Sequence, residues 1–345
     1  MELYKLTTPK DEAWKVIEKL GQEDLVQFLN MNEHVEVTKL IYQDRIKLCE
    51  ESDRRIQYLI NTCREYLIKI NKPSTEIFQR NISSIESEKK KSHELLFEAI
   101  EQDVRESESF VISQRETIDD IKTNIQKLED YEHVVKFINV MMGVLQGARP
   151  AQAARDQENA PGQEPLMEAT LQYIAGTVKR DEMERMKKML FRITRGKALT
   201  HQKNFEQDGV EKVAYLVIFS AAGGNKERVQ KICDSFMGQR FEIPELNQLD
   251  MVMMEIKGKI QKSKNLYDTS VSQLKDYLFD LNLPSERGEV VDSDQTSKLE
   301  IYKWFVAKEK AIYHAMNMLK LTRKTFIGYM WVPEEKESIV AQKLE

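Results

Sequence analysis

The stretch Leu246–Leu281, LNQLDMVMMEIKGKIQKSKNLYDTSVSQLKDYLFDL, decides how this chain is interpreted. It contains one glycine and no proline, and residues suited to a helix core recur in it at steps of three and four. Such near-heptad spacing places these residues on one helix face and favours pairing with another helix. The stretch therefore predicts a long helix in a coiled coil, with core positions at Leu246, Leu249, Met253, Ile256, Ile260, Ser263, Tyr267, Val271, Leu274, Leu278 and Leu281.

Two further spans, 22–72 and 74–142, contain neither glycine nor proline. Apolar stripes at helical spacing run from Ile56 to Ile70 and from Ile118 to Met142, and the charged segment Glu86–Glu94 is a candidate interruption. The whole chain of 345 residues has only 13 Gly and 8 Pro, with 32% charged residues. This composition favours long, solvated helices over a compact enzyme core.

Charge and cysteine content exclude several classes of protein. The formal net charge of −5 argues against a nucleic-acid partner, which usually requires a basic face. Three scattered cysteines without a CxxC pair indicate neither a zinc site nor a disulfide framework. The longest apolar run, Val213–Ala222, is far shorter than the roughly 20 residues of a membrane helix, and the N-terminus lacks a signal peptide's apolar core.

The segment Leu166–Pro244 has a different pattern, which predicts β-α-β-β-α-β, the ferredoxin-like order. Val213–Phe219 is apolar on both faces and so predicts a central strand. The remaining predicted elements are strands at 171–178, 195–205 and 240–243, a helix at 179–194 with Met183, Met186, Met189 and Leu190 on its buried side, and a helix at 225–237.

Strand and helix signals also mark both ends of the chain. Thr8-Pro9-Lys10-Asp11 has the residues of a helix start, with Thr8 as the cap and Pro9 in the first turn, and the helix is expected to end at Gly21. Short strands are predicted at 25–28 and 324–331, a returning helix at 292–321, and a final helix from Glu334. No strand follows that final helix. The Pro- and Gln-rich stretch 147–165 predicts a flexible linker.

Catalytic motifs are absent from the sequence: neither GxxxxGK[ST], GxGxxG nor HExxH occurs. Gly223-Gly224 joins a predicted strand to a helix and could hold an anion, but a plain turn is favoured because the spacing matches no phosphate loop. A packed structural role is favoured for His314. We therefore predict no catalytic residue, cofactor or metal, and a nucleotide titration would test the enzyme alternative.

Two charged clusters are the candidate contact sites. The first lies at the end of the helix predicted at 179–194 and comprises Lys187, Lys188, Arg192, Arg195 and Lys197. Cations there suit the helix dipole and could also bind an acidic partner. The second, Lys308-Glu309-Lys310, predicts an ion-pair site on the returning helix, with a subunit contact and a solvated face left as alternatives.

Five ordered segments resemble the N-terminal cytosolic half of subunit a of the vacuolar-type proton-translocating ATPase, and together they span nearly the whole chain. Local departures from the family pattern occur at Asp24, Asn30, Lys197 and Val332, and they suit a divergent member. The matching segments are Leu20–Asn32, Ile174–Gly196, VQKICDSF at Val229–Phe236, KEKAIYH at Lys308–His314 with the flanking Trp304, Asn317 and Met318, and Trp331 with Pro333.

The resemblance implies an α+β fold that is elongated, with two small α/β, ferredoxin-like lobes joined by a long antiparallel coiled-coil stalk. It further implies that this segment ends before the proximal lobe closes and a membrane half begins. The implied domains are the proximal lobe at 1–32 and 324–345, outgoing stalk arms at 33–145, a linker at 146–165, the distal lobe at 166–245 and a returning hairpin at 246–323.

The function implied by the resemblance is that of a non-catalytic stator collar, which ties the membrane proton channel to peripheral stalks so that torque is resisted. Implied partners are subunits E and G, C, H and d, the c-ring through the absent membrane half, and phosphoinositide headgroups at the distal basic cluster. The implied location is the cytosolic face of an acidic organelle. The alternative is a free-standing coiled-coil tether with a small embedded α/β domain, and no nucleic acid is expected in either case.

Overall fold

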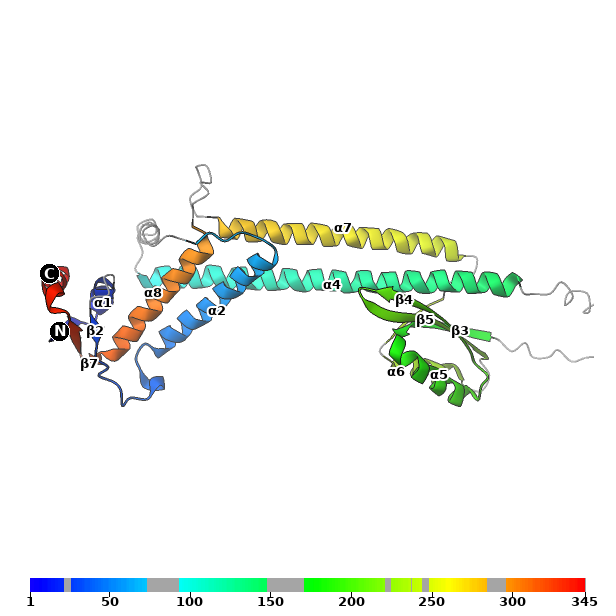
Figure 1. Ribbon diagram of the computed structural model, residues 1–345, viewed down its shortest axis with the longest axis horizontal. Helices are drawn as coiled ribbons and strands as arrows, with labels where there is room; N and C mark the ends of the chain where they lie inside the picture. The colour runs from blue at the N-terminus through cyan, green and yellow to red at the C-terminus, as the bar shows by residue number, and fades with distance from the viewer. Residues whose placement is uncertain are drawn as a thin grey trace, which may run out of the picture. The chain divides into compact units, whose positions relative to one another are not determined.

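The computed structural model describes residues 1–21, 26–72, 93–147, 171–220, 225–236, 238–243, 248–283 and 296–344. They form helices and two antiparallel sheets, as the sequence predicts for a mixed fold (Figure 1). Two compact units can be distinguished: unit 1 holds 1–115 and 272–345, and unit 2 holds 116–271. The division falls within the two long helices α4 (His93–Gly147) and α7 (Leu249–Asn282).

Several predicted connections lie outside the described residues. These are the Gly223-Gly224 turn, the linker at 146–165 apart from its first two residues, and residues 284–295, which include the start of the helix predicted at 292–321. The predicted domain boundaries therefore stay predictions.

Unit 1 contains a small sheet with strand order β1-β8-β2, and β7 also pairs with β8. The central strand β8 runs antiparallel to β1 in a register from Glu2↔Val332 to Pro9↔Thr325. Helices α1 and α9 cover one face, where Leu20 and Val340 pack on Leu6, Met330 and Val332. The elements are β1 (Glu2–Pro9), α1 (Ala13–Gly21), β2 (Gln27–Phe28), β7 (Lys320–Leu321), β8 (Thr325–Val332), a short 3-10 turn (Glu334–Lys336) and α9 (Glu337–Leu344).

The predicted helix cap at Thr8 is wrong. Thr8 and Pro9 belong to β1, where Thr8 is buried and pairs with Phe326, and α1 begins only at Ala13. The residues after Pro9 do form a turn, because the Glu12 amide donates to the Pro9 carbonyl. Thr8 and Pro9 themselves pair with β8, so the helix cannot begin at Thr8.

Two helices of unit 1, α2 (Gln43–Glu65) and α8 (Lys298–Met318), pack side by side (Figure 1), and a 3-10 turn at Val37–Lys39 precedes α2. The predicted stripe on α2 is buried at Ile56, Leu59 and Cys63, but it does not continue to Leu67, whose side chain is 92% exposed. The amides of Leu67 and Ile68 bond back to the carbonyls of Arg64 and Cys63, which ends the helix in a Schellman motif with Leu67 at φ 61°.

Unit 2 contains the second sheet, with strand order β4-β5-β3-β6. The predicted β-α-β-β-α-β order is present, and β5 is buried from Val213 to Phe219 as a central strand should be. Helices α5 and α6 cover one face, but Met189 of α5 is 41% exposed and does not join Met183, Met186 and Leu190 in the core. The elements are β3 (Leu171–Lys179), α5 (Arg180–Thr194), β4 (Leu199–Gln207), β5 (Val210–Ser220), α6 (Asn225–Ser235) and β6 (Gln239–Phe241).

The other face of this sheet packs on the parts of α4 and α7 that lie in unit 2. Ala214, Leu216 and Ile218 of β5 join Val134 and Ile138 of α4, and Leu249, Ile256 and Ile260 of α7, in one buried cluster. These α7 positions belong to the predicted stripe, and Leu274 and Leu278 farther along it are buried as well. The spacing of apolar residues in 246–281 thus identified the inward face of this helix correctly.

A polar anchor sits at the edge of that cluster. The Lys212 ammonium of β5 contacts the nearly buried Asp130 carboxylate of α4 at 2.8 Å and also donates to Gln207. Gln207 in turn donates to Glu129, which pairs with Lys264 of α7 at 2.8 Å. Within unit 2, one network therefore fixes the β4–β5 hairpin against both long helices.

Candidate functional site

The distal basic cluster lies on α5 and on the turn that follows it. Lys188, Arg192, Arg195 and Lys197 are exposed, whereas Lys187 is half-buried. The helix ends because Arg195 takes the left-handed conformation (φ 52°) and Gly196 follows at φ 75°, with its amide bonded to the Phe191 carbonyl. This turn brings the chain back as β4 beside α5, so the cations of the helix and of the turn share one region of unit 2.

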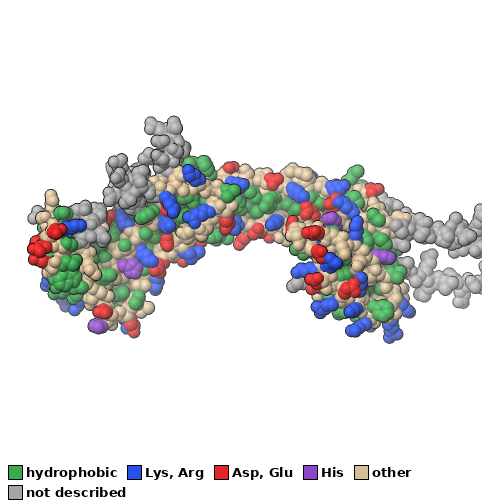
Figure 2. Space-filling view, in the orientation of Figure 1, with side chains coloured by type: hydrophobic (Ala, Val, Ile, Leu, Met, Phe, Trp, Pro, Cys, Tyr) green, Lys and Arg blue, Asp and Glu red, His purple; other side chains and the backbone are tan. Residues whose placement is uncertain are grey.

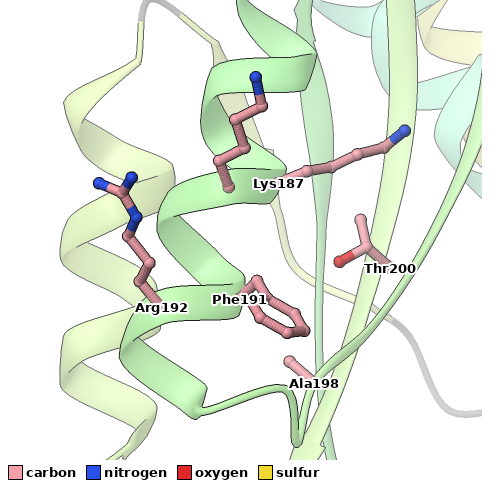
Figure 3. Close-up of a pocket in the computed structure, with 6 residues that line it drawn as sticks. Lys187, Phe191, Arg192, Ala198 and Thr200 are labelled. Carbon is pink, nitrogen blue, oxygen red and sulfur yellow. The ribbon is translucent and has the colours of Figure 1, made fainter.

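A shallow groove opens between α5 and β4 within this cluster (Figure 3). Its volume is about 390 Å³, and its lining residues are Lys187, Lys188, Phe191, Arg192, Ala198 and Thr200. The Phe191 ring faces Ala198 and Thr200, and it is nevertheless 67% exposed. The groove thus combines an exposed aromatic ring with a cationic rim, which suits an anionic group attached to apolar surface.

Most of these cations form no ion pair within the described residues. In the described part of the chain, only Lys187 of the five forms an ion pair, with Glu184 at 2.9 Å, and this contact holds the pKa of the Glu184 carboxyl below its usual value. Lys188, Arg192, Arg195 and Lys197 therefore leave a local excess of positive charge on a chain whose net charge is negative. The sequence identified these cations but missed Phe191, Ala198 and Thr200, because only the α5–β4 packing brings them together.

The α8 cluster is built differently. The Lys308 ammonium lies 2.6 Å from the Glu18 carboxylate of α1 and 5.4 Å from the centre of the Trp14 ring, and Lys310 pairs with Glu50 of α2 at 3.0 Å. The ion-pair interpretation therefore holds for the two lysines, whose pairs join α8 to α1 and α2 inside unit 1. Neither lysine is fully exposed, so both are less available to a partner than the distal cations.

The Glu309 side chain is buried within unit 1. Its side chain has no exposed area, and the Trp14 indole N–H donates to its Oε2 atom at 3.2 Å. Burial raises the pKa of this carboxyl to about 7, although nearby Lys308 and the hydrogen bond from Trp14 act in the opposite direction. A partner contact at Glu309 is thus inconsistent with its position in the structure, because a partner cannot reach a buried carboxylate.

Other candidate chemistry stays without support. His314 is exposed, so its predicted packed position is wrong. No group of three or more potential metal ligands occurs among the described residues. The three cysteine thiols are free and buried, and burial raises their pKa values, so they are poor nucleophiles.

Comparison with known proteins shows which family the chain is related to. Residues 18–345 match the model of the V-type ATPase 116kDa subunit family. The chain belongs to this family. The resemblance of the five ordered sequence motifs is thereby confirmed.

Relatives and one solved structure give the extent of the similarity. The chain is 23% identical to V-type proton ATPase subunit a3 of Arabidopsis thaliana and 24% identical to the 116 kDa subunit a1 of Xenopus laevis, in each case over 96% of its length. It spans only 40% and 38% of those two relatives. The crystal structure of the cytoplasmic N-terminal domain of subunit I, a homologue of subunit a, aligns over 100% of this chain and 97% of its own at 15% identity, with a TM-score of 0.40.

None of the helices in the described ranges combines the length and the apolar character needed to cross a membrane.

Proposed function

We propose that this chain is a non-catalytic stator segment of a proton-pumping V-type ATPase. Membership of the 116 kDa subunit family is the observation that carries the proposal, because relatives that match 96% of the chain are named subunit a. A rotary pump transmits work only if its static part is held against the torque of the rotor. In this proposal the chain ties a membrane proton-channel sector to the peripheral stalks.

The fold is compatible with such a role. Helix α4 has 55 residues, and a helix of that length extends about 80 Å at 1.5 Å per residue. Paired with α7 it would act as an antiparallel coiled-coil stalk, and each of the two sheets would form a lobe that offers a docking surface. The partners in this proposal are the stalk subunits E and G with C, H and d, at the cytosolic face of an acidic organelle.

The test is direct binding to the stalk. Residues 1–345 are titrated with purified E–G heterodimer and, separately, with the purified C component of the pump, and binding is measured by calorimetry. We expect a dissociation constant in the micromolar range for at least one of them. No binding to either at tens of micromolar would refute the stator proposal.

A second proposed contact is anionic and lies at the α5–β4 groove. The exposed Phe191 ring and the unpaired cations Lys188 and Arg192 suit a phosphoinositide headgroup in a membrane surface or an acidic protein segment. Flotation with phosphoinositide-containing vesicles is compared for the native chain and for Lys188→Glu/Arg192→Glu. We expect the variant to lose at least tenfold in binding while its thermal unfolding is unchanged.

The matched control for the groove is Lys226→Glu/Lys231→Glu. These two lysines are exposed on α6 and do not line the groove, so the variant makes the same change in net charge elsewhere in unit 2. It should bind like the native chain. Equal loss in both variants would mean that vesicle binding follows net charge alone, and this would contradict a specific groove.

A further inference from the structure

The two sheets are built to the same plan, although they lie in different units. In unit 2 the strand order is β4-β5-β3-β6, and in unit 1, apart from the two-residue strand β7 that also pairs with β8, the order is β2-β8-β1. In unit 2 one face is covered by α5 and α6, which follow β3 and β5, and in unit 1 one face is covered by α1 and α9, which follow β1 and β8. The two sheets can therefore be compared face by face.

The remaining face differs between them. In unit 2 it carries Ala175, Ala214, Leu216 and Ile218, which are at most 8% exposed because α4 and α7 pack on them. In unit 1 the corresponding face, called here the outer face, carries the residues that alternate with the buried ones. They are Leu3, Lys5 and Thr7 of β1, Gln27 of β2, Lys320 of β7, and Thr325, Ile327, Tyr329 and Trp331 of β8.

This outer face is apolar along its centre and is not buried. Leu3 is 49% exposed and pairs directly with Trp331, which is half-buried like Tyr329 and Ile327. In Figure 2, hydrophobic side chains gather at the left end, where Figure 1 places the N-terminus and β2. A central strand that is apolar on both faces, as β8 is, usually has both faces covered.

The charged strand residues on the outer face all have one sign. Lys5 pairs with Tyr329 and Lys320 pairs with Ile327, so one exposed lysine flanks the apolar row on each side. The strand residues that form the outer face include no Asp or Glu. A complementary ligand must therefore be apolar in the middle and acidic at its margins.

We propose that the outer face binds an amphipathic α-helix of an assembly partner, with Asp and Glu flanking its apolar stripe. The occupant is a helix because the equivalent face of the other sheet is covered by helices within this same chain. The eight residues of β1 extend about 27 Å, which corresponds to about 18 residues of helix. The inference deepens the proposed function by assigning one docking surface, and its test does not require the V-type partner subunits.

The test uses residues 1–345 labelled with 5-fluorotryptophan. The chain has three tryptophans, and only Trp331 lies on the outer face, so its fluorine signal, assigned with Trp331→Phe, reports this site. The probe is a 21-residue designed helix with Leu at heptad positions a and d and Glu at e and g, where mutual repulsion disfavours self-pairing. The control peptide has Lys at e and g instead.

We expect the Glu peptide to shift the Trp331 signal at tens of micromolar, with Trp14 and Trp304 unchanged, and the Lys peptide to bind at least tenfold more weakly. Lys5→Glu/Lys320→Glu should reverse this preference, and both lysines are exposed, so the variant should fold. Lys188→Glu/Arg192→Glu, which changes net charge equally in unit 2, should leave the preference intact.

Three outcomes would overturn the inference: no Trp331 shift at 500 µM peptide, an equal response to both peptides, or a shift that depends only on protein concentration, since a second copy would then occupy the face. The E–G titration is read separately. Peptide binding without binding to E–G or to C would refute the stator proposal alone, whereas E–G binding without any response at Trp331 to either peptide would refute the outer-face inference alone.

Discussion

The two sheets of this protein share a plan of strands and helices but differ in what covers them. The β4-β5-β3-β6 sheet is enclosed by α5 and α6 on one side and by α4 and α7 on the other. The β1-β8-β2 sheet has α1 and α9 on one side and a half-exposed apolar face on the other. The same motif thus serves as an interior layer in one unit and offers a surface in the other.

The first prediction tests this difference in coverage. Leu216→Ala removes a fully buried side chain from the face that α4 and α7 cover, and should cost about 3 kcal/mol of unfolding free energy, as large-to-small core changes do. Leu3→Ala on the outer face should cost less than about 0.5 kcal/mol because Leu3 is half exposed. Urea unfolding followed by circular dichroism measures both, and equal costs would contradict the assignment of covered and open faces.

The second prediction concerns backbone contact within each sheet. A Cβ at Gly176 of β3 would lie 2.3 Å from the Gln239 carbonyl of β6 and 2.7 Å from the Tyr215 hydroxyl. Gly176→Ala should therefore separate β6 from β3 and cost about 2 kcal/mol. A Cβ at Gly328 of β8 would instead meet a terminal methyl of the buried Leu319 side chain, which a rotamer change can move, so Gly328→Ala should cost less. Thermal unfolding measures the stability loss of both variants. A larger loss for Gly328→Ala than for Gly176→Ala would refute the prediction.

The third prediction concerns the pH dependence of folding stability, which should have opposite signs in the two units. Glu309 in unit 1 has a pKa raised to about 7, so the folded state binds its proton more tightly than the unfolded state, and stability falls as pH rises from about 4.5 through 7. From pH 5 to pH 8, the native chain should lose about 2 kcal/mol relative to Glu309→Gln.

In unit 2, burial against Phe205 lowers the pKa of His133, so its contribution to stability falls as pH drops below about 6.5. The matched variant is His133→Gln, which should remove that loss at acidic pH. Hydrogen exchange read separately at α8 and β4 amides distinguishes the two units. If the stability of Glu309→Gln varied with pH as that of the native chain does, the raised pKa could not belong to Glu309.

The smallest expected effect concerns the polar anchor of unit 2. Asp130→Asn leaves Lys212 without its nearly buried anionic partner and should cost about 1–2 kcal/mol. Arg180→Gln breaks a pair with Glu211 in which both side chains are more than half exposed, and should cost less than about 0.5 kcal/mol. Equal losses in urea unfolding would mean that the Asp130–Lys212 contact behaves as a surface pair.

Sequence by itself determined where the long helices lie and most of the residues that they bury, although the predicted stripes fail at Leu67 and Met189. Periodicity at three- and four-residue steps is a local property, and it identified the inward positions of α7 and the ends of α5 without any knowledge of neighbours. The apolar run 213–219 likewise identified a central strand, because a strand that is apolar throughout is usually enclosed on both faces.

Tertiary structure alone decided the points that depend on residues distant in sequence. Pairing with β8 drew Thr8 into a strand despite its helix-start signature, and packing against Trp14 buried Glu309 between two paired lysines. The α5–β4 groove and the outer face each combine residues from separate elements, so no local pattern could reveal them. Side-chain spacing along one segment fixes what that segment buries, whereas contacts between segments depend on the three-dimensional path of the chain.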